Sequence, residues 1–157
     1  MKIVLLLFTH LIFAGIGFAA GVYMLPILIA STPPDATAVA TAMSQSQYQG
    51  EFQRQIAGSD ALHWGEGKLL ITDTLVVHDG TLAPGPDYRL YLSPTLVRDE
   101  AEFAQHAATM VEIGHVTGFN GFALNLPPEI DVSQYGAAVI WCKAFGEFIT
   151  AASLTRK

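Results

Sequence analysis

The feature that most constrains this chain is a long uncharged apolar stretch near its N-terminus. From Ile3 to Ala30 there is no Asp, Glu, Lys or Arg, and Leu, Ile, Phe, Val, Ala and Gly dominate. As an α-helix at about 1.5 Å per residue, this stretch would extend roughly 42 Å, more than the about 30 Å of a bilayer core. The sequence therefore predicts a transmembrane anchor over residues 1–31.

A cleaved secretory signal is the alternative to a retained anchor. The apolar region of such a signal is usually about 7 to 15 residues, which is shorter than the stretch found here. Small-residue cleavage sites are nevertheless present at Ala38-Val39-Ala40 and Ala40-Thr41-Ala42. Both interpretations export the rest of the chain, and they differ in whether the helix is retained.

The charges that flank the apolar stretch predict its orientation. Lys2 and the amino terminus precede it, and the first charge after it is Asp35. Because positive charge favours the cytoplasmic side, we expect a single-pass cell-membrane protein with an extracytoplasmic C-terminal part, periplasmic or extracellular. Lipid attachment near residues 20–40 is excluded, since the only cysteine is Cys142.

The exported part is acidic. Beyond Ala30, seven Lys and Arg residues stand against fourteen Asp and Glu residues, and no basic cluster interrupts them. This balance argues against phosphate backbones and anionic lipid headgroups as ligands. We therefore predict no nucleic-acid partner.

Composition divides the exported part into a tether and one domain. Residues 32–47 are rich in Pro, Thr, Ala, Ser and Gln, and Pro33-Pro34 prevents the first helix from continuing, so we expect a flexible linker. The remaining residues, 48–157, match one domain with a single core.

The domain reads as short strands between turn residues. Tyr88–Leu92 alternates apolar and polar side chains between Pro-rich turns, and Phe122–Leu126 repeats the pattern. The other candidate strands are 50–52, 67–72, 75–78, 111–113, 137–143 and 147–152. About seven or eight short strands predict an all-β fold, an antiparallel β-sandwich or barrel. Leu96–Ala107 contains helix formers with acids in its first turns, so we expect one inserted surface helix.

Several segments of the domain resemble a known family. They are Gly85–Ser93, Gly121–Pro127, Asp131–Tyr135, and Val139–Cys142 with Phe145. Together they are similar to the electron transfer DM-thirteen domain, of the bacterial single-domain type, over Tyr48 to about Leu154. The Trp-Cys pair that follows an Asp-rich turn and a Tyr is the most specific of these motifs.

The resemblance implies a secreted or membrane-tethered all-β domain that takes part in redox or electron transfer through its cysteine. Cys142 is then the predicted redox thiol, and Trp141, Asp87 and Tyr135 are the predicted binding residues. The haem-binding neighbour domain found beside animal members is missing here. Gly114–Asn120 also departs from the Gly- and Asn-rich loop of those members, which weakens any transfer of a partner surface.

The physical chemistry of the thiol leaves two interpretations open. In a regular strand, Cys142 shares a face with Ile140, while Val139 and Trp141 share the other, so we expect Cys142 to be buried. Burial raises a thiol pKa and lowers reactivity. Cys142 is therefore either a core residue of a binding or structural module of the cell envelope, or a thiol that meets a redox or envelope protein partner.

No cofactor or metal site is predicted. His63, His78, His106 and His115 are scattered, and no pair has ligand spacing or a haem-attachment motif. No nucleophile elbow or phosphate-binding loop is present, so a classical enzyme is not expected. Gly17 and Gly21 form a Gly-x-x-x-Gly step in the apolar helix, which would allow a homodimer.

Overall fold

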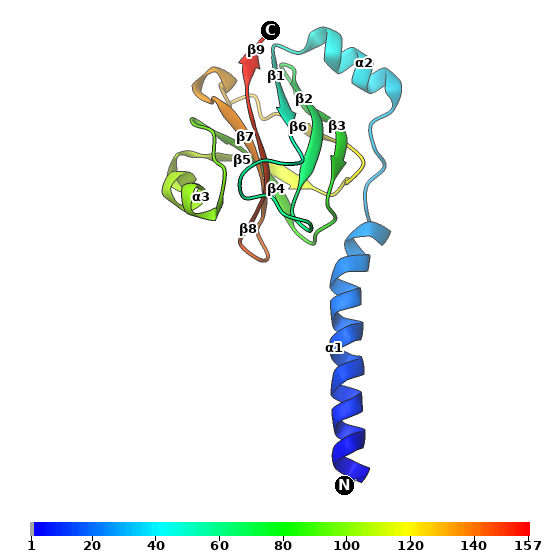
Figure 1. The fold of residues 1–157 in the computed structure, drawn as a ribbon. Helices are drawn as coiled ribbons and strands as arrows, with labels where there is room; N and C mark the ends of the chain where they lie inside the picture. Colours follow the sequence, from blue (N-terminus) through cyan, green and yellow to red (C-terminus); the bar gives the residue numbers. More distant parts are fainter. Residues whose placement is uncertain (1) are drawn as a thin grey trace.

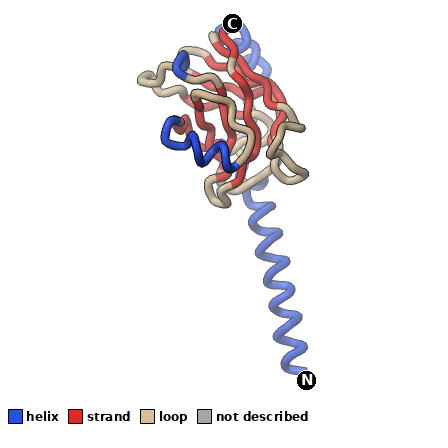
Figure 2. The backbone as a smooth tube through the Cα atoms, turned by 60° about the vertical axis from the view of Figure 1, so that its left-hand side comes forward, coloured by secondary structure: helices blue, strands red, loops and turns tan. Residues whose placement is uncertain are grey.

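The computed structural model describes residues 2–157, which form a β-sandwich with one long helix leading away from it (Figure 1). Helix α1 (Lys2–Leu28) is the one helix in the described chain that is long and apolar enough to cross a membrane. Its large side chains are exposed along its length, and Pro26 is its one buried residue. Figure 2 shows α1 as an isolated rod below the strands, which is the form expected of a single membrane span or signal anchor.

Within residues 2–157, nine strands make two antiparallel sheets. The first sheet has the order β6-β3-β2-β1-β9 and consists of β1 (Tyr48–Phe52), β2 (Gly65–Ile71), β3 (Leu75–Leu82), β6 (Phe122–Asn125) and β9 (Thr155–Arg156). The second has the order β5-β4-β7-β8 and consists of β4 (Tyr88–Ser93), β5 (Val111–Val116), β7 (Ala137–Cys142) and β8 (Glu147–Ser153). The predicted all-β sandwich is confirmed. The strand beyond the expected seven or eight is the two-residue β9, which is too short to show a period.

The core lies between the sheets because each strand sends alternate side chains inward. Leu69 and Ile71 of β2 meet Leu90 of β4 and Ile140 of β7 in one buried cluster. Leu90 and Ile140 are directly opposite each other in the β4–β7 pair. Fully burying a side chain of this size contributes about 1.5 to 3 kcal/mol, so the cluster accounts for most of the driving force of folding.

Helix α3 (Glu100–His106) covers the outer face of the second sheet, as predicted for the inserted helix, and a 3-10 turn at Ala107–Thr109 follows it. It begins at Glu100 because the Asp99 side chain caps it, accepting a hydrogen bond from the Glu102 N–H at 2.8 Å. Phe103 packs in a second buried cluster with Val139 and Phe148. Residues 96–98, which were included in the predicted helix, precede this cap and are not helical.

The segment predicted to be a flexible linker contains a helix, α2 (Ala36–Gln45). Asp35 caps it by accepting from the Ala38 N–H at 2.7 Å. Val39 and Ala42 pack against Leu70 and Val77 on the outer face of the first sheet. The linker expectation is therefore wrong for these ten residues. The sequence pattern did not predict this helix because only two of its side chains form the apolar contact with the sheet, and the many alanines leave no clear helical period.

The chain between α1 and α2 is attached to one end of the sandwich. The Ser31 N–H donates to the Thr117 carbonyl oxygen at 3.1 Å, and the Thr117 hydroxyl donates to the Ser31 hydroxyl at 3.1 Å. Pro33 and Pro34 approach Gly121. We call this the near end of the sandwich. It comprises the loops 60–63, 83–87, 117–121 and 143–146, and the opposite end is the far end.

Candidate functional site

Cys142 is the last residue of β7, at the near end. It pairs with Tyr88 of β4 on one side and Glu147 of β8 on the other. Its side chain belongs to the same core cluster as Ile140, whereas Val139 and Trp141 belong to the outer cluster. The predicted division of faces along this strand is confirmed, and so is the burial of Cys142, which is 2% exposed.

Two opposing influences act on the Cys142 thiol. Burial raises its pKa above the ordinary value, because the low-dielectric surroundings disfavour the thiolate. The backbone N–H groups of Phe145, Asp87 and Ala144 act the other way, and burial prevails. The thiol is therefore protonated at neutral pH, and its resting reactivity is low. The same amide groups would favour a thiolate once the proton has left.

The loops around the sulfur are held by backbone contacts. The Lys143 N–H donates to the Asp87 carbonyl oxygen at 2.8 Å, which ties the end of β7 to the loop before β4. The Gly146 N–H donates to the Cys142 carbonyl oxygen at 2.8 Å, closing the β7–β8 turn. Gly146 has φ +70°, a left-handed conformation that glycine adopts without strain. The sulfur is thus enclosed by two short, mutually bonded loops.

A cavity of about 350 Å³ lies between these loops and helix α1. Most of its lining is apolar or aromatic, and Cys142 forms part of its wall. The lining residues are Phe18, Ala19, Val22, Tyr23, Leu62, His63, Pro84, Gly85, Pro86, Tyr88, Cys142 and Phe145. Access to the sulfur is therefore from the side of the domain that faces the helix.

Tyr88 forms the inner wall of this cavity. It is 1% exposed, and its ring lies edge-on to Phe119, with ring centroids 5.8 Å apart. A Cβ on Gly85 would come within 2.4 Å of the Tyr88 ring, so only glycine allows the ring to sit there. Burial, and then the neighbouring Cys142, raise the pKa of the Tyr88 phenol well above its ordinary value. Tyr88 is therefore a neutral neighbour of the thiol.

Asp87 lies beside Cys142 in the structure, although its side chain serves an ion-pair network. Its carboxylate accepts from the Arg89 Nε at 2.8 Å and lies 3.7 Å from the His115 Nε2. Arg89 in turn contacts Glu112 at 3.2 Å, and Lys143 contacts the same Glu112 at 3.4 Å. Burial alone would raise the pKa of Glu112, but the Tyr91 hydroxyl, Lys143 and Arg89 together lower it. Glu112 therefore stays ionised and paired with Arg89 and Lys143.

Trp141 and Tyr135, the other predicted binding residues, do not meet Cys142. The Trp141 ring is stacked on Phe103 of α3, with centroids 3.8 Å apart and planes 3° apart. It faces the opposite side of β7 from the sulfur, so its contacts are with the inserted helix. Tyr135 lies at the other end of β7, at the far end of the sandwich, after the 3-10 turn Val132–Gln134. Whether either residue binds a partner stays a prediction.

The histidines are placed separately. His78 is fully buried between Phe52 and Phe122, and its Nε2 lies 3.1 Å from the Glu66 carbonyl oxygen. Burial lowers its pKa to about 4, so it is neutral at physiological pH. His63 pairs with Asp60 at 3.1 Å. Among residues 2–157, no three His, Cys, Asp or Glu side chains gather as metal ligands would.

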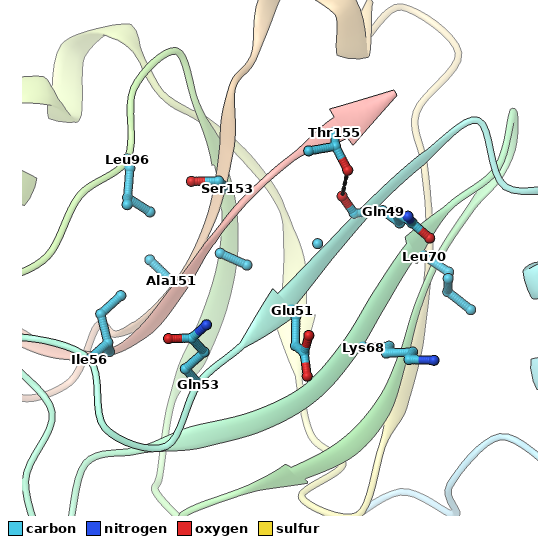
Figure 3. A pocket seen from close by; sticks show the side chains of 12 residues that line it. Gln49, Glu51, Gln53, Ile56, Lys68, Leu70, Leu96, Ala151, Ser153 and Thr155 are labelled. Carbon is cyan, nitrogen blue, oxygen red and sulfur yellow. Dashed lines mark hydrogen bonds between the residues drawn. The ribbon is translucent and has the colours of Figure 1, made fainter. Parts of the chain in front are cut away.

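Another cavity, of about 470 Å³, lies along the corner where β1 and β8 bring the two sheets together (Figure 3). Its floor includes Glu51 and Lys68, which are opposite each other in the β1–β2 pair. The Thr155 hydroxyl closes one side by donating to the Gln49 carbonyl oxygen at 3.2 Å. Neither histidine nor cysteine lines this groove.

Sequence reasoning missed the cavity beside Cys142 because its walls come from distant segments. Tyr88 was identified as a strand residue, and Phe145 as part of the resemblance, but neither was assigned to a site. The helix residues Phe18 and Val22 were interpreted only as membrane-spanning. One signal was available in the sequence: Phe145 is an aromatic residue in a turn, between Lys143 and Gly146, where a polar residue is usual.

Comparison with known proteins agrees with the geometry. The family model described as Electron transfer DM13 matches residues 51–154. This match covers most of the sandwich, from within β1 to the end of β8, and includes the cavity wall from Leu62 to Phe145. The chain belongs to the DM-thirteen family, as the resemblance implied. No curated protein and no solved structure matches the chain significantly.

Proposed function

We propose that the protein is a membrane-anchored, extracytoplasmic electron-transfer accessory that acts through Cys142. The observation that carries this proposal is the position of Cys142. Its sulfur closes a defined cavity at the near end, and three backbone N–H groups act to favour its thiolate. Membership in a family described as electron-transfer domains supplies the class of chemistry.

The reaction that suits a single thiol is thiol–disulfide exchange with an envelope protein. The Cys142 thiolate attacks one sulfur of the partner's disulfide, so that the partner's S–S bond breaks as a mixed disulfide forms. The released partner sulfur takes up the proton that Cys142 gave up. A thiolate of a second, reduced dithiol protein then attacks the Cys142 sulfur, which releases the partner as a dithiol. The remaining thiol of the dithiol protein displaces Cys142 as a thiol and forms a disulfide, so two electrons pass from the dithiol protein to the partner. Since Cys142 is 2% exposed, the turn 143–146 has to open for the partner to reach the sulfur.

A structural or binding module of the cell envelope is the second candidate function, and the burial of Cys142 favours it. In this case the sulfur is a small core group between Tyr88 and Glu147, with a raised pKa that keeps it inert. The loops 80–87 and 115–120 would form the partner surface in this interpretation. Much of that surface already contacts the chain itself, through Pro26, Ser31 and the prolines that follow.

The two candidates differ in what Cys142→Ser should do. If the protein exchanges thiols, the serine variant folds but loses all covalent linkage to its partner. The measurement is acid-quenched, non-reducing electrophoresis of the membrane fraction, with Cys142→Ala as a second thiol-free variant. A linked species in the wild type that both variants lack supports the electron-transfer proposal. Absence of any linked species, with an unchanged phenotype in both variants, contradicts it and supports the structural module.

Retention of α1 and its orientation belong to the same proposal. The candidate signal-cleavage sites 38–40 and 40–42 lie inside α2, whose Val39 and Ala42 pack on the sheet. Cutting there would remove a packed helix turn, which favours a retained anchor. Pairing through Gly17 and Gly21 is proposed in addition, because both glycines have open space around them. Intact mass of the mature protein tests retention, since a species that begins near Thr41 would overturn it.

A further inference from the structure

The starting observation is the distribution of exposed apolar side chains on the body of the protein. Outside the apolar stretch 3–30, four large apolar residues are exposed among the described residues: Leu62 at 66%, Phe145 at 61%, Met43 at 41% and Leu75 at 38%. The two most exposed, Leu62 and Phe145, come from different loops. They nevertheless line the same cavity at the near end, facing α1.

The depth of this cavity follows from the length of α1. A bilayer core needs about 20 helical residues, and the helix begins beside Lys2, whose charge stays at the membrane surface. Counting from Ile3 places Phe18 and Val22 in the outer half of the core and Tyr23 at its boundary, where aromatic residues concentrate. These three residues form the helix wall of the cavity. Leu62 and Phe145, which form the opposite wall, therefore lie at the same depth.

The attachment of α1 to the sandwich keeps the two walls together. Pro26 is buried against the near end, where Pro86 and Phe119 line the same small pocket. The Ser31–Thr117 hydrogen bonds follow a few residues later. A helix fixed at these points cannot move its preceding turns far from the loops 60–63 and 143–146. Figures 1 and 2 agree in placing the lower loops of the sandwich beside the top of α1.

We infer that the near end rests in the outer leaflet, with Leu62 and Phe145 inserted at the boundary between headgroups and acyl chains, and that lipid acyl chains occupy the cavity beside Cys142. Continuity selects this occupant, since the exposed apolar surface of α1 runs directly into the cavity wall. Inserting apolar side chains to a depth of about 5 to 10 Å is the usual mode of interfacial binding. The inference rests on the membrane anchor of the proposed function and does not depend on the chemistry of the thiol.

A second copy of the chain is the competing occupant, and helix geometry argues against it. At about 100° per residue, the Gly17 and Gly21 face points roughly opposite to the face that carries Phe18, Val22 and Tyr23. Two copies paired through the glycines would therefore leave both cavities open to lipid. Pairing and lipid insertion are compatible, and the experiment below separates them.

The test uses full-length protein in nanodiscs made with either ordinary or acyl-chain-brominated phosphatidylcholine. Phe145→Trp and Leu62→Trp each add a fluorophore at the near end, and Leu75→Trp adds one at the far end as the matched control. After subtraction of the wild-type signal from Trp64 and Trp141, brominated lipid should reduce the emission of both near-end tryptophans by about twofold or more and leave Leu75→Trp unchanged. Circular dichroism confirms that each variant is folded.

The alternative results are distinct. Equal emission in both lipids for Phe145→Trp and Leu62→Trp overturns the inference. The same result together with a protein-to-disc ratio of two identifies a second copy as the occupant. Resistance of the wild type to alkaline carbonate extraction from membranes reports on the anchor separately. If the protein is extracted, the membrane anchor of the proposed function is contradicted. If the protein stays in the membrane but the near-end tryptophans are not quenched, only the inference of a lipid-occupied cavity is contradicted.

Discussion

The two ends of the sandwich present different side chains to their surroundings. Polar side chains cap loops at both ends: Asp131 accepts from the Ser133 N–H at 3.0 Å at the far end, and Asp60 accepts from the Leu62 N–H at 2.7 Å at the near end. The near end also carries the two most exposed large apolar side chains of the domain, Leu62 and Phe145. An end that meets water needs polar caps alone, whereas an end that meets a helix and a bilayer can leave apolar side chains outside.

Cys142 is at the apolar end, and this location changes the meaning of its burial. A sulfur that is 2% exposed would be inert in a domain surrounded by water. Here the cavity beside it opens toward the apolar surface of α1, so a hydrophobic molecule can enter the cavity more readily than a charged one. The apolar surroundings of Cys142 therefore matter for both proposed functions, because they decide which molecules can reach the sulfur.

The largest expected effect comes from removing the ring that packs the near end. Tyr88→Ala should lower the free energy of unfolding by about 3 to 5 kcal/mol, because it empties a fully buried aromatic site. Tyr135→Ala, at the far end, removes a half-buried ring and should cost about 1 kcal/mol. Urea unfolding of the full-length protein in detergent, followed by near-UV circular dichroism, measures both. Equal losses of unfolding free energy in the two variants would show that the two ends are packed equally well.

The buried His78, midway between the ends, gives the next largest effect and depends on pH. Its folded pKa of about 4 is below the ordinary histidine value of about 6.5, so the unfolded chain binds the proton more readily. Stability from this group is complete above pH 6.5 and falls as the pH drops toward 4, by roughly 3 kcal/mol in total.

His78→Gln should flatten that part of the profile relative to the wild type, in unfolding curves measured from pH 7 to pH 4. His106→Gln, at the half-buried C-terminal end of α3, is the control for removing an imidazole elsewhere in the domain. An identical slope in the wild type and His78→Gln would show that His78 is not held neutral by burial.

Substitutions of Cys142 should lower the free energy of unfolding by less, and they test whether the sulfur itself is packed in the core at the near end. Cys142→Ala should cost about 1 kcal/mol as a modest large-to-small core change. Cys142→Ser should cost about 1 kcal/mol more, because it buries a hydroxyl in place of a weakly polar thiol. Thermal unfolding of the three proteins in the same detergent measures the order. Serine and alanine variants as stable as the wild type would show that the sulfur is not packed in the core.

The smallest expected effect is a gain. The Thr150 hydroxyl is fully buried in β8 and has no hydrogen-bond partner among the described residues. Thr150→Val keeps the shape and removes the unpaired group, so it should raise the free energy of unfolding by about 1 kcal/mol. Ser153→Val, on the exposed end of the same strand, should change little. A loss of stability in Thr150→Val would indicate that a buried water molecule hydrogen-bonds to the Thr150 hydroxyl.

Local pattern was enough to predict much of this fold. Alternation along Tyr88–Leu92 located β4, and the strand period along 139–142 predicted the two faces of β7, because the period of a strand is visible in a few residues. Helix α2 was missed because its contact depends on just Val39 and Ala42, and β9 was missed because it has two residues.

The candidate site was predicted less completely than the fold. Cys142 was identified through the family resemblance, and its burial through the strand period. The cavity could not be predicted, since its walls come from α1, loop 60–63, loop 83–87 and the turn after β7, which meet only in the folded chain. Trp141 is next to Cys142 in sequence but faces away from it, which adjacency alone does not reveal.

The most direct test of the account is to compare two thiol reagents on Cys142 in full-length protein reconstituted in lipid. One is a pyrene maleimide that partitions into the bilayer, and the other is a sulfonated maleimide confined to water. In a Cys142→Ala background, Glu51→Cys supplies a water-exposed control thiol. The account predicts that the bilayer-soluble reagent modifies Cys142 at least about tenfold faster, relative to the control thiol, than the sulfonated one. Equal relative rates, or modification by the sulfonated reagent alone, would contradict it.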